Sequence, residues 1–162
     1  MEGNNENWVV QACLHLTKLI ASRGAVVDSN QGSIALDAYA EACLDGYVPV
    51  IRFMLDSGAD VNGQCAEGNT PLMDAAITGH TEAVDLLLRR GAVVDLPNKN
   101  HYTALHAACF TAHERAVRLL MAAGASTTLE DSRGRSAMDW ATEPRHAAVR
   151  QLLQQHMHAE GQ

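Results

Sequence analysis

The sequence predicts an all-α solenoid in which short helix pairs repeat along the chain and stack on one another. Three independent series of residues recur with one constant period of about 33 residues, and each series marks the same point in successive helix pairs. Their members are Thr70, Thr103 and Ser136; Gly58, Gly91 and Gly124; and His80, His113 and His146. Aromatic residues make up only 4% of the 162 residues, so the core must consist mainly of alanine, leucine, valine and methionine. Such a core suits thin helices at close spacing better than a β-sandwich or barrel.

Within one period, the residues predict two helices and a loop. Thr70 is suited to cap the first helix, and Pro71 fits its first turn. Gly79 breaks that helix, and Gly91 ends the second one because glycine readily adopts a positive φ. The polar residues that follow, 92–102, favour an extended or hairpin-like loop. Each period is therefore a helix-turn-helix unit followed by such a loop.

The repeated residues match the pattern of a known family. They are Thr70-Pro71-Leu72, Ala75-Ala76, Gly79-His80 and Leu86-Leu87-Leu88, with Gly58-Ala59-Asp60-Val61-Asn62 in the preceding period. This pattern resembles the ankyrin repeat family. The resemblance implies repeats at 37–69, 70–102 and 103–135, a C-terminal capping repeat at 136–157 and a tail at 158–162. Residues 1–36 would form an N-terminal cap or a degenerate half-repeat. In this family the recurring histidine and the one at the His106 position are structural.

Stacking predicts that equivalent positions form columns through the core, because no repeat can bury its apolar face alone. Two of these columns are large and apolar, and a third consists of small residues that let the two helices of a repeat approach closely. The columns are Phe53, Leu86, Leu119 and Leu152; Met54, Leu87, Leu120 and Leu153; and Ala42, Ala75, Ala108 and Ala141.

Composition and charge exclude several classes of protein. No apolar segment approaches the length of roughly 18 residues that a bilayer-spanning helix needs, and the N-terminus lacks the basic start of a signal peptide. The net charge of −7 argues against general binding to nucleic acid or to anionic lipid. Residues 1–98 carry 13 acidic and 5 basic residues, whereas residues 99–162 carry 6 and 7. We therefore expect a cytoplasmic or nuclear protein with reduced thiols that is monomeric by itself and binds neither nucleic acid nor membranes.

The chemistry-bearing residues do not form a catalytic pattern, and we expect no enzyme, metal or cofactor. Cys43 and Cys109 share a phase two layers apart, about 16–20 Å, which exceeds the roughly 7 Å limit of a disulfide. The recurring histidines occur one per layer, so three cannot hold one zinc ion. Two neighbours could, but a structural role is the preferred interpretation. Cys65 lies in a predicted loop and is the most reactive thiol expected.

The resemblance implies a concave groove between the loops and the exposed side of the first helices. Leu44, Ile77 and Phe110 stand one period apart at a position that usually faces this groove. They form a candidate binding stripe, although they could instead pack beneath the loops as satellite core. Polar residues that follow the stripe or lie in the loops complete the predicted partner-binding set. These are Asp45, Thr78, Thr111, Glu67, Asn69, Lys99, Tyr102, Arg133 and Arg135.

The sequence thus favours a non-enzymatic protein-interaction module that binds a protein partner through the groove, as an adaptor, a scaffold or a small inhibitor. The alternative is the terminal segment of a larger array with a structural or regulatory role. A metal or redox module is a third class that zinc content and thiol titration would test. Asn62 adds a possible modification site, because its loop resembles the ankyrin loops that 2-oxoglutarate-dependent oxygenases hydroxylate on asparagine.

Overall fold

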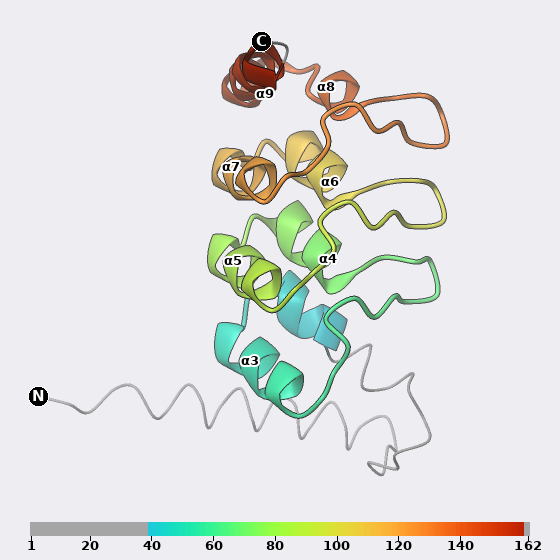
Figure 1. Cartoon of the computed structure of the whole chain (residues 1–162), viewed down its shortest axis with the longest axis vertical. Helices are drawn as coiled ribbons and strands as arrows, with labels where there is room; N and C mark the ends of the chain where they lie inside the picture. Colours follow the sequence, from blue (N-terminus) through green and yellow to red (C-terminus); the bar gives the residue numbers. More distant parts are fainter. Residues whose placement is uncertain (1–38, 161–162) are drawn as a thin grey trace, which may run out of the picture.

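The computed structural model describes residues 39–160, and there the predicted all-α solenoid is confirmed (Figure 1). Residues 39–44 are helical and precede α3 (Val48–Asp56). Three further pairs follow: α4 (Pro71–Thr78) with α5 (Thr81–Arg89), α6 (Ala104–Phe110) with α7 (Glu114–Ala122), and α8 (Ala137–Trp140) with α9 (Ala147–Glu160). A 3-10 turn, Pro144–His146, joins α8 to α9. The predicted cap or half-repeat at 1–36 lies outside the described residues.

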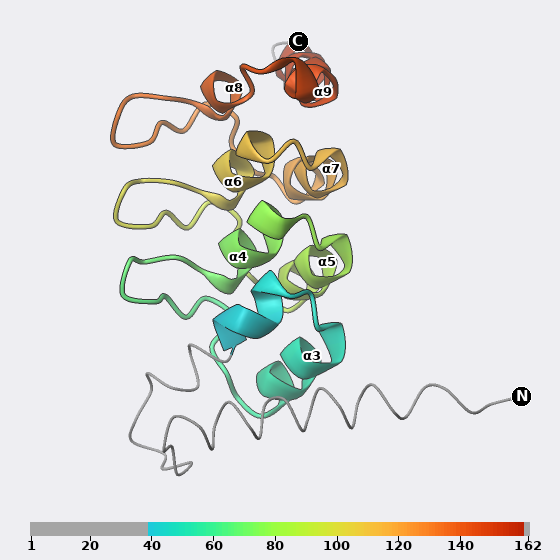
Figure 2. The same ribbon diagram turned by 180° about the vertical axis from the view of Figure 1, so that it is seen from behind.

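The helices form two parallel columns, and the loops project from one side of them. The first helices of the pairs, α4, α6 and α8, stack in the inner column, and α3, α5, α7 and α9 form the outer column (Figures 1 and 2). We call the loop segments 59–69, 92–102 and 125–135 the fingers, because they extend beyond the inner column (Figure 2). Across the part of the chain that the structure describes, no helix has the length and apolar character needed to cross a membrane.

The ends of α4 show how the sequence sets the helix boundaries. The hydroxyl oxygen of Thr70 accepts a hydrogen bond from the backbone N–H of Met73 at 3.2 Å, as an N-cap residue does. Pro71 occupies the first turn, where its missing N–H costs nothing. Gly79 ends the helix with a φ of 75°. The next helix, α5, then begins after His80 and turns back along α4.

The core follows most of the predicted columns, but Met54 and Leu119 are only half-buried and Phe53 is exposed. Leu87, Leu120 and Leu153 are fully buried, and the alanine column is between 0% and 4% exposed. Phe53 was expected to be buried in the other leucine column, but its side chain is 68% exposed. The reason is its layer: among the described helices of the outer column, α3 contacts only α5, whereas α5 and α7 each have a neighbour on both sides.

The last pair departs from the others because its first helix is short. α8 has four residues, whereas α4 has eight and α6 seven. Proline disfavours helical geometry in the residue before it, and Glu143, which precedes Pro144, is extended with a ψ of 160°. The chain therefore leaves the helix early. α9 is correspondingly long and runs to Glu160, beyond the repeat end at 157 that the sequence suggested.

Side chains at one recurring phase connect the first repeat to the second and the second to the third. The Oδ1 atom of Asn62 accepts a hydrogen bond from the backbone N–H of Val93 at 2.8 Å. One period later, both carboxylate oxygens of Asp95 lie 3.1 Å from the backbone nitrogen of Ser126. Each of these side chains belongs to one repeat and satisfies a backbone donor of the following repeat. The predicted hydroxylation site is thus half-buried in a structural contact, and its modification stays a prediction.

The turn glycines offer a test of how tightly the layers are packed. A Cβ atom at Gly79 would overlap the ring of His113 in the next layer, whereas a Cβ at Gly91 would meet open space. Both residues have a positive φ, so both alanine variants should lose about 1–2 kcal/mol of stability to backbone strain. We expect Gly79→Ala to lose about 1–3 kcal/mol more from overpacking. Urea unfolding measures both losses, and equal losses would contradict this account of the layer contact.

Candidate functional site

The predicted stripe lies at the C-terminal ends of the stacked first helices. Leu44, Ile77 and Phe110 are 38%, 36% and 42% exposed, although large apolar side chains are usually buried. The hydroxyls of two neighbouring residues are already occupied. Thr78 donates to the carbonyl oxygen of Asp74 at 3.0 Å, and Thr111 donates to its own helix in the same way at 2.9 Å. The stripe therefore presents mainly apolar surface, beside the exposed carboxylate of Asp45.

Each of the last two fingers is shaped by one Asn or Asp side chain. The Oδ1 atom of Asn98 accepts the backbone N–H groups of Asn100 and Tyr102 at 2.9 and 3.0 Å. Asp131, one period later, accepts those of Arg133 and Arg135 at 2.8 and 3.1 Å. Side-chain acceptors of this kind stabilise tight turns. In the first finger Cys65 holds this phase, and its thiol lies 3.3 Å from a carboxylate oxygen of Glu67.

Backbone hydrogen bonds join each finger to the next. The N–H of Lys99 donates to the carbonyl oxygen of Glu67 at 3.2 Å, and the N–H of Ser132 donates to that of Asn100 at 2.8 Å. The Asn98 amide also donates to the side-chain oxygen of Asn69 at 2.7 Å. Among the polar residues predicted to bind the partner, Asn69 is therefore hydrogen-bonded to the neighbouring finger. The side chains of Lys99 and Glu67 are exposed at the finger tips.

An aromatic cluster forms where the third repeat meets the fourth. The Trp140 ring packs edge-on against Tyr102 and Phe110, with ring centroids 5.2 and 5.3 Å apart. Tyr102 in turn stacks on His106 at 5.3 Å. Such arrangements contribute about 0.5–1.5 kcal/mol beyond the area that they bury. Phe110 therefore has two roles, because it belongs both to the exposed stripe and to this cluster.

His106 supports the aromatic cluster, because Tyr102 stacks on its ring and hydrogen bonds hold that ring in place. Its Nδ1 atom accepts the backbone N–H of Thr103 at 3.1 Å, and its Nε2 atom lies 3.1 Å from the carbonyl oxygen of Leu129. A backbone N–H can only donate and a carbonyl can only accept, so the ring is neutral with its proton on Nε2. Burial disfavours the charged ring and lowers the pKa of His106 below its usual value. The residue is structural, as the resemblance implied.

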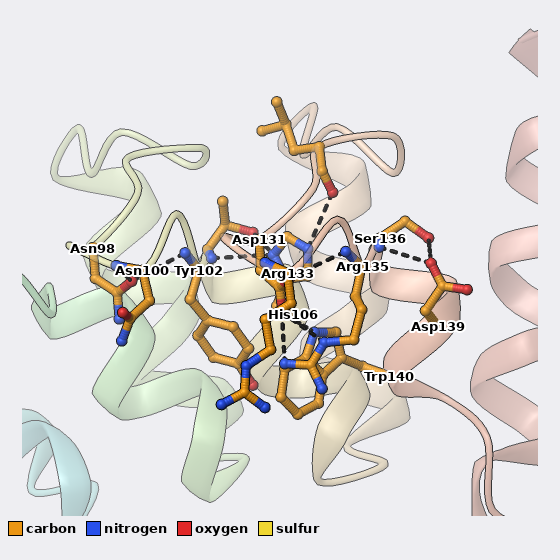
Figure 3. A network of polar contacts seen from close by, with 12 residues as sticks. Asn98, Asn100, Tyr102, His106, Asp131, Arg133, Arg135, Ser136, Asp139 and Trp140 are labelled. Atoms are coloured by element: carbon orange, nitrogen blue, oxygen red, sulfur yellow. Dashed lines mark hydrogen bonds and ion pairs between the residues drawn. The ribbon is translucent and has the colours of Figure 1, made fainter.

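Asp131, Arg135 and Trp140 form a polar network over this cluster (Figure 3). The Arg135 guanidinium pairs with the Asp131 carboxylate at 2.8 Å and lies 3.8 Å above the Trp140 ring centroid. The Trp140 indole N–H also donates to Asp131, at 3.2 Å. Burial would raise the pKa of Asp131. Hydrogen bonds from the Arg135 side chain and from the backbone N–H groups of Arg135 and Arg133 outweigh it and lower that pKa to about 2.

The network borders an open hollow of about 360 Å³. Residues from the second finger, the third finger and α8 line it: Asn98, Asn100, Tyr102, Asp131, Ser132, Arg133, Arg135 and Trp140. The structure thus brings three of the predicted site residues together, namely Tyr102, Arg133 and Arg135. Sequence analysis missed Trp140 and Asp131. A usable signal existed for Asp131, because Asn98 precedes it by one period at the start of a polar loop.

The first helix of the second layer, α4, carries an unusual carboxylate. Asp74 lies on α4 one turn before Ile77, at the phase that Trp140 occupies in the last repeat. Burial raises the pKa of Asp74 to about 6, and among the described residues no side chain or backbone N–H donates to its carboxylate. Perturbed carboxylates of this kind are typical of functional sites, although structural networks produce them too.

The thiols and histidines show no reactive arrangement in the residues described here. Cys43 and Cys109 are buried free thiols, and burial raises the pKa of Cys109 to about 12. Both match the interpretation that they are small core residues, whereas Cys65 is half-buried in the first finger. No group of three potential metal ligands comes together within residues 39–160. Cys13 lies outside the described part of the chain.

Asp74 makes folding stability depend on pH in a defined window. Its pKa is higher in the folded state, about 6, than the usual value near 3.9, so the folded state holds the proton more tightly. The contribution of Asp74 to stability is therefore greatest below pH 4, falls as the pH rises towards 6 and is constant above that. Asp74→Asn should remove this fall and gain on the order of 1–3 kcal/mol at pH 7.5, but little at pH 4.

Thermal unfolding of both proteins from pH 4 to 8 measures this difference. Asp45→Asn is the matched control, since it makes the same chemical change at an exposed position. If Asp74→Asn changed the melting temperature by the same amount at every pH, ionisation of the Asp74 carboxylate would not be the cause of the change.

Comparisons with known proteins agree with this architecture. A search of curated proteins found no significant match to the chain. The family model described as ankyrin repeats (3 copies) matches residues 8–98 and 90–161, which together cover most of the sequence. The match includes the layers that carry the stripe, the fingers and the aromatic cluster. The chain belongs to the ankyrin repeat family.

Proposed function

We propose that this chain is an adaptor, a scaffold or a small inhibitor that binds a protein partner across the concave groove, in the cytoplasm or nucleus. Ankyrin repeats are non-enzymatic protein–protein interaction modules, which makes binding the expected activity. The observation that carries the proposal is the stripe of Leu44, Ile77 and Phe110, which leaves more than a third of each side chain exposed on successive layers. Three such side chains in one groove are costly to leave in water, at roughly 25 cal/mol per Å².

Charge supports the same face and suggests the orientation of the partner. The exposed Asp45 lies beside Leu44 at one end of the stripe, and Arg133 and Arg135 lie beyond Phe110 at the other. A partner with an apolar anchor and opposite charges at its two ends would complement this groove. Complementary charge mainly sets register and specificity, whereas apolar and aromatic anchors supply most of the affinity. The chain itself would act as a monomer in this arrangement.

Removing the stripe should abolish binding without unfolding the protein. We choose Leu44→Ser with Ile77→Ser, because Phe110 also packs against Trp140. The double variant should reduce capture of partner proteins from cell lysate at least tenfold, while the circular dichroism spectrum and melting temperature stay nearly unchanged. Quantitative affinity capture beside the unmodified protein measures the effect.

The control is Phe53→Ser with Val93→Ser, which removes two other exposed apolar side chains, 68% and 52% exposed. This control should capture the same partners as the unmodified protein. If Leu44→Ser with Ile77→Ser unfolds, the stripe is core. If it folds and still binds, the partner contacts another face, as the alternative role as the terminal segment of a larger array would allow.

A further inference from the structure

The basic end of the groove contains hydrogen-bond donors that the fold does not use. The Arg133 side chain is exposed and makes no ion pair with any described residue, although it borders the hollow described above. The guanidinium of Arg135 contacts Asp131 through Nε and Nη2, which leaves its Nη1 group for another acceptor. The side chains of Asn100 and Ser132 line the same hollow and also lack a partner within the described part of the chain.

The one acid in the hollow cannot satisfy these donors. The Oδ1 atom of Asp131 accepts two backbone N–H groups, from Arg133 and Arg135. Its Oδ2 atom accepts the Arg135 guanidinium and the Trp140 indole N–H. The carboxylate is thus fully engaged in holding the third finger and the Trp140 ring in place. The two arginines and this acid leave a net positive charge in the hollow.

We propose that this hollow binds a carboxylate side chain, Asp or Glu, of an extended peptide segment of the partner. The carboxylate pairs with Arg133 and lies against the edge of the Tyr102–Trp140 ring pair, which lines the hollow. The inference rests on the proposed groove function and specifies which residue type the partner presents at this end. It also fixes a neighbour: the next side chain of the segment must be large and apolar, because Phe110 connects the hollow to the stripe.

Geometry and charge favour a peptide carboxylate over other anions. A guanidinium matches the planar carboxylate with two parallel hydrogen bonds. Tyr102, Arg133 and Arg135 extend to the same side of the fingers, towards the inner helices, so an occupant there also contacts the aromatic cluster (Figure 3). Nucleic acid and anionic membranes need a broad basic surface, whereas this chain carries a net charge of −7. A single acidic side chain within an apolar peptide needs only this local positive charge.

The test uses a phage library of random twelve-residue peptides, selected on the full chain. Binding peptides should be enriched in Asp or Glu next to a large apolar residue. A fluorescein-labelled synthetic copy of the most enriched peptide then serves as the probe in fluorescence polarisation. Replacing its acidic residue by Gln or Asn should weaken binding about tenfold to hundredfold, as expected for the loss of a charge-assisted hydrogen-bonded pair.

Variants of the protein test whether Arg133 is the residue that binds the peptide carboxylate. Arg133→Glu should weaken binding of the acidic probe by at least the same factor. A probe with Lys in place of its acidic residue should bind Arg133→Glu at least fivefold more tightly than it binds the unmodified protein. Arg115→Glu is the matched control, because it makes the same change of charge at an exposed position on α7, in the outer column away from the fingers. It should alter the affinity less than twofold.

The outcomes separate this inference from the proposed function. Peptides that lose binding in Leu44→Ser with Ile77→Ser but are indifferent to Arg133→Glu would overturn the carboxylate assignment and leave the groove function standing. Peptides that depend on Arg133 but not on the stripe would support the hollow and contradict the extended groove. Selection without acidic enrichment, no selected peptide at all, or equal effects of Arg115→Glu and Arg133→Glu would each overturn the proposal.

Discussion

The alanine column sets the spacing on which the rest of the structure depends. Ala42, Ala75, Ala108 and Ala141 are essentially inaccessible, and their size lets the inner and outer helices of each pair approach closely. Equivalent helices of successive layers stack in the same column, so side chains one period apart in the sequence lie one layer apart in space. The leucine columns, the fingers and the groove stripe all inherit this spacing. A larger residue in the column would force the two helices of its pair apart.

The sequence predicted most strongly what the stack repeats. The roles of Thr70, Gly79 and the Leu87 column were predicted correctly because similar residue types recur from period to period. These residues begin a helix, end a helix or fill the core of their repeats. The family resemblance also implied that the polar loops lie beside the first helices of the pairs. Phe53 was placed wrongly, because its burial depends on what covers α3 and not on the repeating pattern.

The candidate site was harder to predict because it is built where the pattern breaks. Trp140 stands at the phase that holds Asp74 and Ala107 in earlier repeats, and nothing in the period says that an indole there meets Tyr102 across the layer. Its partner Asp131 accepts donors from a loop and from a helix in different repeats. Such a contact depends on the relative placement of two layers, which periodicity fixes only approximately.

The two side chains at the Asn62 phase that connect successive repeats act in the same direction along the chain. Asn62 and Asp95 each reach forward, so that the backbone donor they satisfy is always the later one in the sequence. During synthesis on the ribosome, the N-terminal member of each pair emerges first. The acceptor side chain of the earlier repeat has therefore already been synthesised when the backbone donor of the next repeat emerges. The direction of these two contacts thus matches the order in which the repeats are translated.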